Sequence, residues 1–251
     1  MLSTVSSSDA SETNVALSGD GLRLYIQRSN DGLLVAERNS IEDTFAEAKG
    51  NNVLENINVW IGTAQHWSLD GASADGDTLY FTYGGQGIEN AFSSTLDGSG
   101  AFQTPRRIED LQDVQVNHVF PSWTGDELYL SCAGDLFVSS RADEEFQEPE
   151  PLLALNSAAH EDNVIVSADS RTLYWATNRT DGGAIGDSDI WKAVRTGPGA
   201  SFSGPQNVTE LNTALSEAPE ALTEDECEIF LVRDNPDSGT LDIFVARRPL
   251  E

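Results

Sequence analysis

Short apolar runs separated by polar turns recur along the chain and define one repeated unit. The stretch SADGDTLYF at residues 73–81 places a Ser-x-Asp-Gly turn directly before an apolar, aromatic run. Comparable stretches begin at Ser18, Thr124, Ser167 and Thr223, the one at Thr124 with a turn two residues shorter. Because these starts recur at intervals of about 50 residues, the pattern indicates five copies of one supersecondary unit.

Each unit predicts four short strands. A second apolar run follows the first in every copy, and it begins at Gly32, Asn90, Asp135, Asp189 and Asp242. Four copies then carry a segment led by phenylalanine, at Phe45, Phe102, Phe146 and Phe202. Proline follows the phenylalanine in three of them, which suits an outermost strand because one side of an edge strand has no ladder partner.

A four-stranded sheet of this kind cannot bury both faces alone, so the units are expected to close radially. We predict an all-β, five-bladed β-propeller with four-stranded antiparallel blades as one domain over residues 1–251. The expected blades cover about residues 12–56, 66–113, 117–155, 160–212 and 217–248.

The last unit ends without its fourth strand, which points to the other end of the chain. We expect residues 2–6 to supply that strand and so to close the last blade. The alternative is that the serine-rich segment is a tail without regular structure, since its composition is typical of a loop.

The run NSAAHEDNVIVSADSRTLYWATNRTDGGAIGDSDIWKAVR, residues 156–195, resembles the WD-like propeller repeat of TolB-type proteins. That family's pattern has Glu-x-x-Pro-x-x-Ser-x-Asp-Gly, then Leu-Tyr-Phe, then Asp-Ile-Trp. The resemblance covers essentially the whole chain and implies the fold, but the family includes scaffolds, partner-binding proteins and domains fused to enzymes. The chain departs from the pattern at Trp67 and His118, in the Glu position, and at Asp70, in the Pro position.

The charge narrows the possible partners. The formal net charge is −28, from 42 acidic and 14 basic residues. Such a surface repels phosphate backbones, so we expect no nucleic acid partner, while cations and basic protein surfaces are favoured. Solubility alone also explains a charge of this kind. No apolar stretch approaches the roughly 18 residues of a spanning helix, so no membrane span is expected. We also expect the protein to be a monomer.

The start of the chain and its cysteines leave the compartment open. A cytoplasmic protein is expected if Met1 is the native start, and a periplasmic or secreted one if a leader has been removed. Cys132 and Cys227 belong to different units, so we expect them to lie too far apart for a disulfide.

The innermost strands of a propeller bring equivalent positions of all units to one axis. Six residues before each turn the chain has Glu12, Trp67, His118, Glu161 and Glu217, and one position earlier it has Ser11, His66, Asn117, His160 and Ser216. Three residues before the turn, Asp70 and Glu220 add two acids deeper in the channel. The alignment therefore predicts a polar ring at one mouth of the channel.

Two kinds of binding fit this ring. A divalent metal (zinc, manganese, iron or calcium) suits carboxylate and imidazole ligands, for which the candidates are Glu12, His118, Glu161 and Glu217. A small polar ligand or sugar would be met by His66, Trp67, Asn117 and His160, with the indole as a stacking platform. The plainer alternatives are that the glutamates hydrogen-bond backbone amides between blades and that Trp67 only packs.

A hydrolase is the alternative function. By analogy with five-bladed glycosidases, two channel carboxylates would act as acid and as base or nucleophile, with candidates Asp70, Glu161, Glu217 and Glu220. A metal-activated water is a second route to hydrolysis. A second alternative is a protein-interaction scaffold with an inert channel.

Three arginines lie just after the Leu-Tyr strands, at Arg28, Arg179 and Arg233. We expect them to pair with acids of neighbouring blades.

Overall fold

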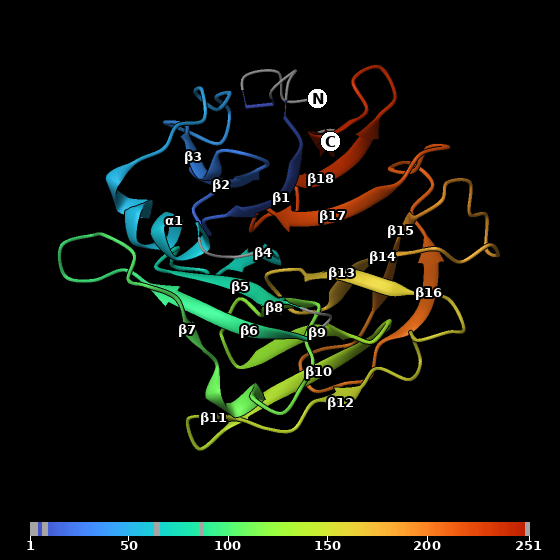
Figure 1. Cartoon of the computed structure of the whole chain (residues 1–251). Helices are drawn as coiled ribbons and strands as arrows, with labels where there is room; N and C mark the ends of the chain where they lie inside the picture. The colour runs from blue at the N-terminus through green and yellow to red at the C-terminus, as the bar shows by residue number, and fades with distance from the viewer. Residues whose placement is uncertain (1–4, 7–9, 63–65, 86–87, 249–251) are drawn as a thin grey trace.

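Five small antiparallel sheets stand around one axis and form a five-bladed β-propeller (Figure 1). The computed structural model describes residues 5, 6, 10–62, 66–85 and 88–248. Within each sheet the strands follow the order of the sequence from the axis outward. The predicted fold is therefore confirmed.

The blades contain three or four successive strands in the described residues, not four throughout. Blade 1 consists of β1 (Glu12–Leu17), β2 (Arg23–Arg28) and β3 (Gly32–Glu37). Blade 2 consists of β4 (His66–Ala72), β5 (Thr78–Gly85), β6 (Ile88–Thr95) and β7 (Arg106–Arg107). In blade 3, β8 (His118–Pro121), β9 (Glu127–Cys132) and β10 (Asp135–Ala142) are followed by two short pieces that both pair with β10, β11 (Glu145–Phe146) and β12 (Glu150–Pro151).

The last two blades repeat this difference. Blade 4 has β13 (Glu161–Val166), β14 (Thr172–Thr177), β15 (Asp189–Val194) and β16 (Ser203–Asn207). Blade 5 has β17 (Glu217–Leu222), β18 (Glu228–Asn235) and β19 (Thr240–Arg247). A 3₁₀ turn, η2 (Glu109–Leu111), lies between blades 2 and 3.

A helix takes the place of a full fourth strand in blade 1. The expected edge strand after Phe45 is reduced to a bridge between Val35 and Lys49. The chain then forms η1 (Asn52–Leu54) and α1 (Glu55–Ile61), and the Asn51 side chain caps the first turn. Ile57 and Ile61 lie four residues apart on one face of α1 and are buried against the core between blades 1 and 2. Burial of this apolar face stabilises the helix over an edge strand.

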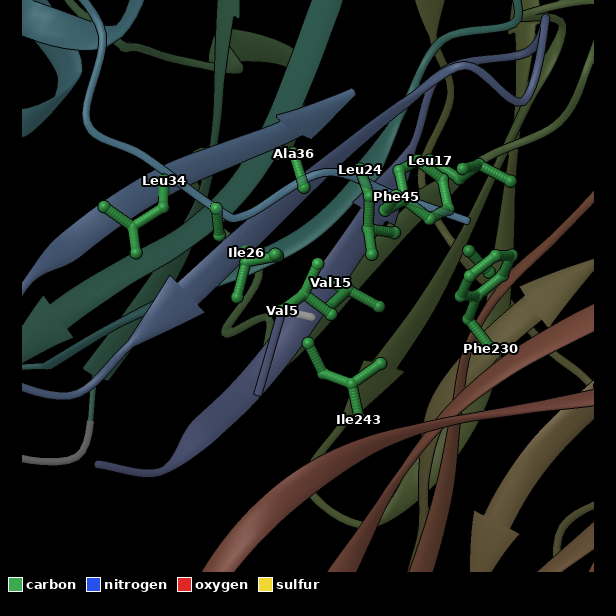
Figure 2. Close-up of a cluster of buried hydrophobic side chains, with 12 residues drawn as sticks. Val5, Val15, Leu17, Leu24, Ile26, Leu34, Ala36, Phe45, Phe230 and Ile243 are labelled. Carbon is green, nitrogen blue, oxygen red and sulfur yellow. The ribbon is translucent and has the colours of Figure 1, made fainter. Parts of the chain in front are cut away.

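The N-terminal segment packs on the outer side of blade 5. Val5 is buried with Val15 and Ile243 in one apolar cluster (Figure 2). The Ile243 amide donates to Ser6 Oγ at 3.4 Å, and the Leu241 amide donates to Ser11 Oγ at 3.2 Å. The expected latch strand falls on residues 2–6, of which 2–4 lie outside the described residues, and Val5 and Ser6 are not in a regular strand.

An ion pair joins the first blade to the last. Arg38 Nη2 lies 2.7 Å from Glu228 Oε2, with the Arg38 side chain only 1% exposed. The Arg38 guanidinium also covers the ring of Phe45. Arg195 of blade 4 repeats this arrangement with Glu127 of blade 3 at 2.6 Å and with the ring of Phe202. Blades 1 and 5 are therefore joined by the same contact that joins two consecutive blades.

The turn of blade 3 differs from its sequence alignment. The Gly125 amide donates to Ser122 O and the Glu127 amide to Ser122 Oγ, both at 3.0 Å. Gly76 and Thr78 make the same bonds to Ser73 in blade 2. The turn therefore starts at Ser122 and has the usual length, so the alignment on Thr124 with a shortened turn was wrong.

Over the residues that the structure describes, four of the five innermost strands carry a β-bulge and β8 carries none. The register skips Asp70 in β4, Glu220 in β17, Thr13 in β1, and both Asn163 and Val164 in β13. An extra residue of this kind is left out of the ladder and turns the strand locally. Because β8 lacks it, Asn117 occupies the position taken by glutamate in blades 1, 4 and 5, and His118 the next one.

Two further expectations concern cysteines and membranes. Cys132 and Cys227 are both free, as predicted. Among the described residues, no helix is both long and apolar enough to cross a membrane.

Candidate functional site

One residue from each innermost strand faces a cavity at the mouth of the axial channel. Counted by strand register, the five equivalent residues pair with Gln27, Thr82, Ser131, Ala176 and Val232 of the second strands, and they are Asn14, Ser68, His118, Asp162 and Ala218. All five line the same cavity, whose volume is about 590 Å³. The absence of a bulge in β8 is what places His118 in this ring.

The rest of the lining comes from the strand ends and loops at the same mouth. Asn117 and His160, both predicted as ligand-binding residues, line the cavity together with Asn178, Asp187, Ser188 and Ser216. The lining is mainly hydroxyl, amide, carboxylate and imidazole groups. No lysine or arginine belongs to the lining in the part of the chain that the structure describes. The cavity therefore offers hydrogen bonds in a negative surrounding.

The three glutamates that the sequence aligns before the turns, Glu12, Glu161 and Glu217, are buried in ion pairs within their own blades. Arg28 Nε lies 2.7 Å from Glu12 Oε1, and Arg233 Nε lies 2.7 Å from Glu217 Oε1. Each glutamate side chain is 0% exposed. The arginines were expected to pair with neighbouring blades, and this expectation was wrong: each one reaches across its own inner hairpin.

The third glutamate shows what these pairs do. Glu161 accepts hydrogen bonds from the backbone amide and hydroxyl of Ser157, at 3.2 and 2.5 Å, and from Arg179 Nη2 at 3.1 Å. Arg179 Nη2 also donates to the carbonyl of Leu155. Ser157 and Leu155 belong to the linker from blade 3, so the pair ties the linker to the inner strand. Thr213 and Leu211 make the equivalent bonds to Glu217 and Arg233.

The structure does not gather the predicted metal ligands into one cluster. Over the described ranges, no three His, Cys, Asp or Glu side chains form a group that could hold a metal ion. Of the four predicted ligands, His118 and Glu217 line the axial cavity, while Glu12 and Glu161 do not. The metal site stays a prediction.

A buried polar cluster lies behind the cavity, where His118 meets Asp70. His118 Nδ1 is 3.4 Å from Asp70 Oδ1, and both side chains are at most 3% exposed. His118 Nε2 is 3.1 Å from the carbonyl oxygen of Val164, which can only accept, so Nε2 carries a hydrogen. Nδ1 faces the Asp70 carboxylate at an ion-pair distance. A protonated His118 would therefore be stabilised by the charge of Asp70.

Burial and charge shift the pKa values in this cluster. Burial raises the pKa of Asp70, although the neighbouring His118 opposes it. Burial alone would lower the pKa of His118, but the charges of Asp70, Asp162 and Glu220 outweigh it and raise the pKa. Burial raises the pKa of Glu220 to about 8, against the effect of His118 and of the Val15 amide and Asn163 side chain, which donate to its two oxygens at 3.1 Å. Glu220 is therefore largely protonated near neutral pH.

The catalytic candidates separate into two groups. Asp70, Glu161 and Glu220 are at most 1% exposed and are not part of the cavity lining. Glu217 lines the cavity but is held by Arg233 and Thr213. Asp162 and Asp187, which we had not predicted, are the other carboxylates of the lining.

The two remaining predicted residues, His66 and Trp67, do not line the axial cavity. His66 is exposed at the start of β4. Trp67 lines a second cavity, of about 470 Å³, which shares Thr13 with the axial one. Trp67 is thus placed next to the axial site and outside its lining.

The sequence alignment did not predict Asn14, Ser68 and Asp162 because it is offset from the ring position. Asp162 and Ser68 come directly after the aligned glutamate position, and Asn14 is displaced by one more residue through the bulge at Thr13. Side chains on a strand alternate between its faces, so a shift by one residue exchanges them. Reading one position further along the alignment would have found Ser68 and Asp162.

Comparisons with known proteins support the fold. No protein-family profile matches the chain, and no curated protein matches it in sequence. Several solved structures are similar. A candidate TolB from Agrobacterium tumefaciens has a TM-score of 0.53 at 15% identity, with 94% of this chain and 82% of that one covered.

Two enzymes are among the similar structures. The periplasmic gluconolactonase PpgL of Pseudomonas aeruginosa has a TM-score of 0.50 at 15% identity, covering 94% of this chain and 72% of that one. The α-L-arabinofuranosidase PaAbf62A of Podospora anserina, solved with cellotriose, has a TM-score of 0.53 at 14% identity, covering 96% and 91%. At such identities the likeness shows a shared propeller fold and leaves function open.

Proposed function

We propose that this propeller binds a small polar ligand, uncharged or cationic, in the axial cavity. The observation that carries the proposal is the ring of Asn14, Ser68, His118 and Asp162 around a cavity of about 590 Å³. This volume falls in the range of about 300–1,000 Å³ usual for small-molecule sites. Asn14, Ser68 and Asp162 supply amide, hydroxyl and carboxylate groups from three different blades, which converge on one ligand, whereas the ring nitrogens of His118 are directed to Asp70 and Val164.

The charge of the cavity supports this ligand class. Asp162, Asp187 and Glu217 contribute carboxylates, and Glu217 is already neutralised by Arg233. An anionic ligand would have to be desolvated against these acids and against a net charge of −28. Hydroxyl and amino groups, by contrast, can donate to the carboxylates and amides.

The proposal is tested by calorimetric titration with single-class probes. Glucose, xylose and arabinose represent polyols, spermidine represents cations, and gluconate is the anionic control. We expect a polyol or spermidine to bind and gluconate not to bind. Asn117→Ala and Ser68→Ala should weaken binding at least about tenfold, as expected for the loss of a hydrogen bond in a desolvated site.

A matched control separates binding from stability. Ser73→Ala removes a turn serine at the opposite end of the inner strands, and it should lower stability without changing affinity. If no probe binds, or if Asn117→Ala alters stability alone, the protein is better described as a scaffold with an inert channel that meets a basic protein surface.

A hydrolase is the second candidate, and one observation favours it. Asp162 and Asp187 line the same cavity as the exposed His160, so carboxylates and an imidazole face one ligand. The structures of a gluconolactonase and an arabinofuranosidase show that similar propellers can support hydrolysis in other proteins. Nitrophenyl glycosides and gluconolactone are suitable substrates. Turnover that is lost in both Asp162→Asn and Asp187→Asn would support this function, and no turnover would exclude it for these substrates.

A further inference from the structure

The second cavity opens beside the axial one at the same mouth of the propeller. It lies between blades 1 and 2, where the turn after β2, the end of α1 and the start of β4 come together. Its volume of about 470 Å³ is again in the usual range for a small-molecule site. Thr13 lines both cavities, so the two are neighbours that meet at this residue.

Trp67 is held in place as one wall of this second cavity. Gln27 Nε2 donates to Trp67 O at 3.0 Å, and the Leu69 amide donates to Gln27 Oε1 at 2.8 Å. These two bonds tie the backbone of Trp67 and Leu69, on either side of Ser68, to Gln27 of blade 1. The Trp67 side chain packs against the core between blades 1 and 2 but remains partly exposed. The indole therefore presents part of its surface to the cavity.

The other lining groups complement an aromatic wall. Ser29 and Asn30 offer hydroxyl and amide groups, and Ile61 adds apolar surface. Among the described residues, the one cation of this lining is Arg28, which is paired with Glu12 at 2.7 Å and lies 3.6 Å from Asp31. An indole beside uncharged polar groups suits a molecule with one apolar face and several hydroxyls. A pyranose ring has this character.

We propose that the ligand is a saccharide of at least two units. One unit occupies the axial cavity, and the next stacks on Trp67 in the second cavity. This inference rests on the proposed function, because it names the ligand class of the same site and extends the site sideways. It adds Trp67 as the residue that distinguishes a disaccharide from its monosaccharide.

The test compares matched sugar pairs by calorimetry: glucose with cellobiose, xylose with xylobiose, and galactose with lactose. In at least one pair, the disaccharide should bind at least about tenfold tighter than the monosaccharide. Trp67→Ala should abolish this difference and leave the monosaccharide affinity unchanged, while Trp67→Phe should retain most of it. Asn117→Ala should weaken both members of the pair.

The control is Trp123→Ala, since Trp123 lies at the opposite end of the channel and should leave both affinities unchanged. A disaccharide that binds no tighter than its monosaccharide overturns the extended site and leaves the proposed function intact. The same holds if Trp67→Ala weakens both sugars equally. Binding of spermidine alone, with no sugar bound, overturns the saccharide class, and absence of binding by every probe overturns the proposed function as well.

Discussion

Arg38 and Glu228 are 190 residues apart in sequence, and their side chains form a 2.7 Å ion pair that joins blade 1 to blade 5. Glu228 also accepts from Arg247 Nε at 2.7 Å, so its carboxylate lies between two guanidinium groups. Arg38 Nε in turn donates to the carbonyl of Gly21. The closure of the ring therefore depends on a buried ionic contact as well as on apolar packing.

Removing Arg38 should open this closure. Arg38→Met leaves Glu228 largely buried with only the more exposed Arg247 as a partner, and breaking a buried pair in this way costs about 3–5 kcal/mol. We expect a loss of this size in the free energy of unfolding, measured by urea denaturation. Arg171→Met is the matched control, because its pair with Asp169 is exposed and worth at most about 1 kcal/mol. Equal losses in the two variants would contradict a special role for the closure.

The raised pKa of Glu220 makes stability depend on pH. The folded protein keeps this carboxyl protonated up to about pH 8, whereas the ordinary value is 4.5. The stabilisation is therefore complete below about pH 4.5 and is lost as the pH rises towards 8. Glu220→Gln cannot ionise, so its stability relative to the natural protein should increase between these two pH values and then level off.

Chemical denaturation at pH 4, 6, 8 and 9 measures this difference. Glu224→Gln serves as the control, because Glu224 is exposed in the same blade. Its difference from the natural protein should show no such rise. A Glu220→Gln difference that stays constant with pH would mean that the carboxyl is ionised in the folded state.

The buried, arginine-paired glutamates should prove important for the free energy of unfolding. Glu161→Ala leaves the Arg179 guanidinium, only 10% exposed, without its carboxylate, at a cost of about 3–5 kcal/mol. Glu148→Ala, at an exposed position in blade 3, should change the free energy of unfolding by less than about 0.5 kcal/mol. Thermal and urea unfolding of the two variants decide the point.

The metal prediction is tested on the same proteins. Tag-free protein is incubated with excess zinc, manganese, iron or calcium, dialysed, and analysed for bound elements. If Glu12, His118, Glu161 and Glu217 hold a metal, one element should be near-stoichiometric and should be lost in both His118→Ala and Glu161→Ala. Protein without bound metal under all four conditions would refute the site.

Gly19 should tolerate no side chain. A Cβ atom at Gly19 would lie 1.9 Å from the carbonyl oxygen of Ala74, in the equivalent turn of blade 2. Because the clash is with backbone, Gly19→Ala should destabilise the protein by at least about 2 kcal/mol. Gly98→Ala, which meets no atom within 4 Å, is the control and should be nearly neutral. A neutral Gly19→Ala would show that the two blades can move apart freely.

The sequence predicted the fold well because the repeat encodes it. The first residue of the turn accepts a hydrogen bond from the amide five residues on at Ser18, Ser73, Ser167 and Thr223. In these four blades the turn pattern therefore marks where the second strand begins. The helix α1 interrupts this regularity and has no counterpart in the described residues of the other units. Its prediction depends on the helical spacing of Ile57 and Ile61, which is specific to this unit and does not belong to the repeat.

The candidate site was predicted only in part. A bulge moves a side chain to the other face of its strand, while the repeat pattern of the sequence stays the same. Asn117 and His160 were correctly expected near the mouth. His118 was aligned with the glutamates, whereas the missing bulge of β8 places it one position further on and into the cavity. Sequence spacing alone does not tell a bulged strand from a regular one, so Asn14 could not be recognised, whereas Asp162 directly follows the aligned Glu161.

The irregular inner strands have a consequence for how such a site can change. Inserting or deleting one residue between the ring position and the Ser-x-Asp-Gly turn exchanges which side chain faces the axis, while the second strand and the blade core keep their places. In β8 the shorter strand brings an imidazole to the axis, where β4 presents a hydroxyl. The ligand chemistry of this propeller can thus be altered blade by blade through strand length, with no substitution in the lining.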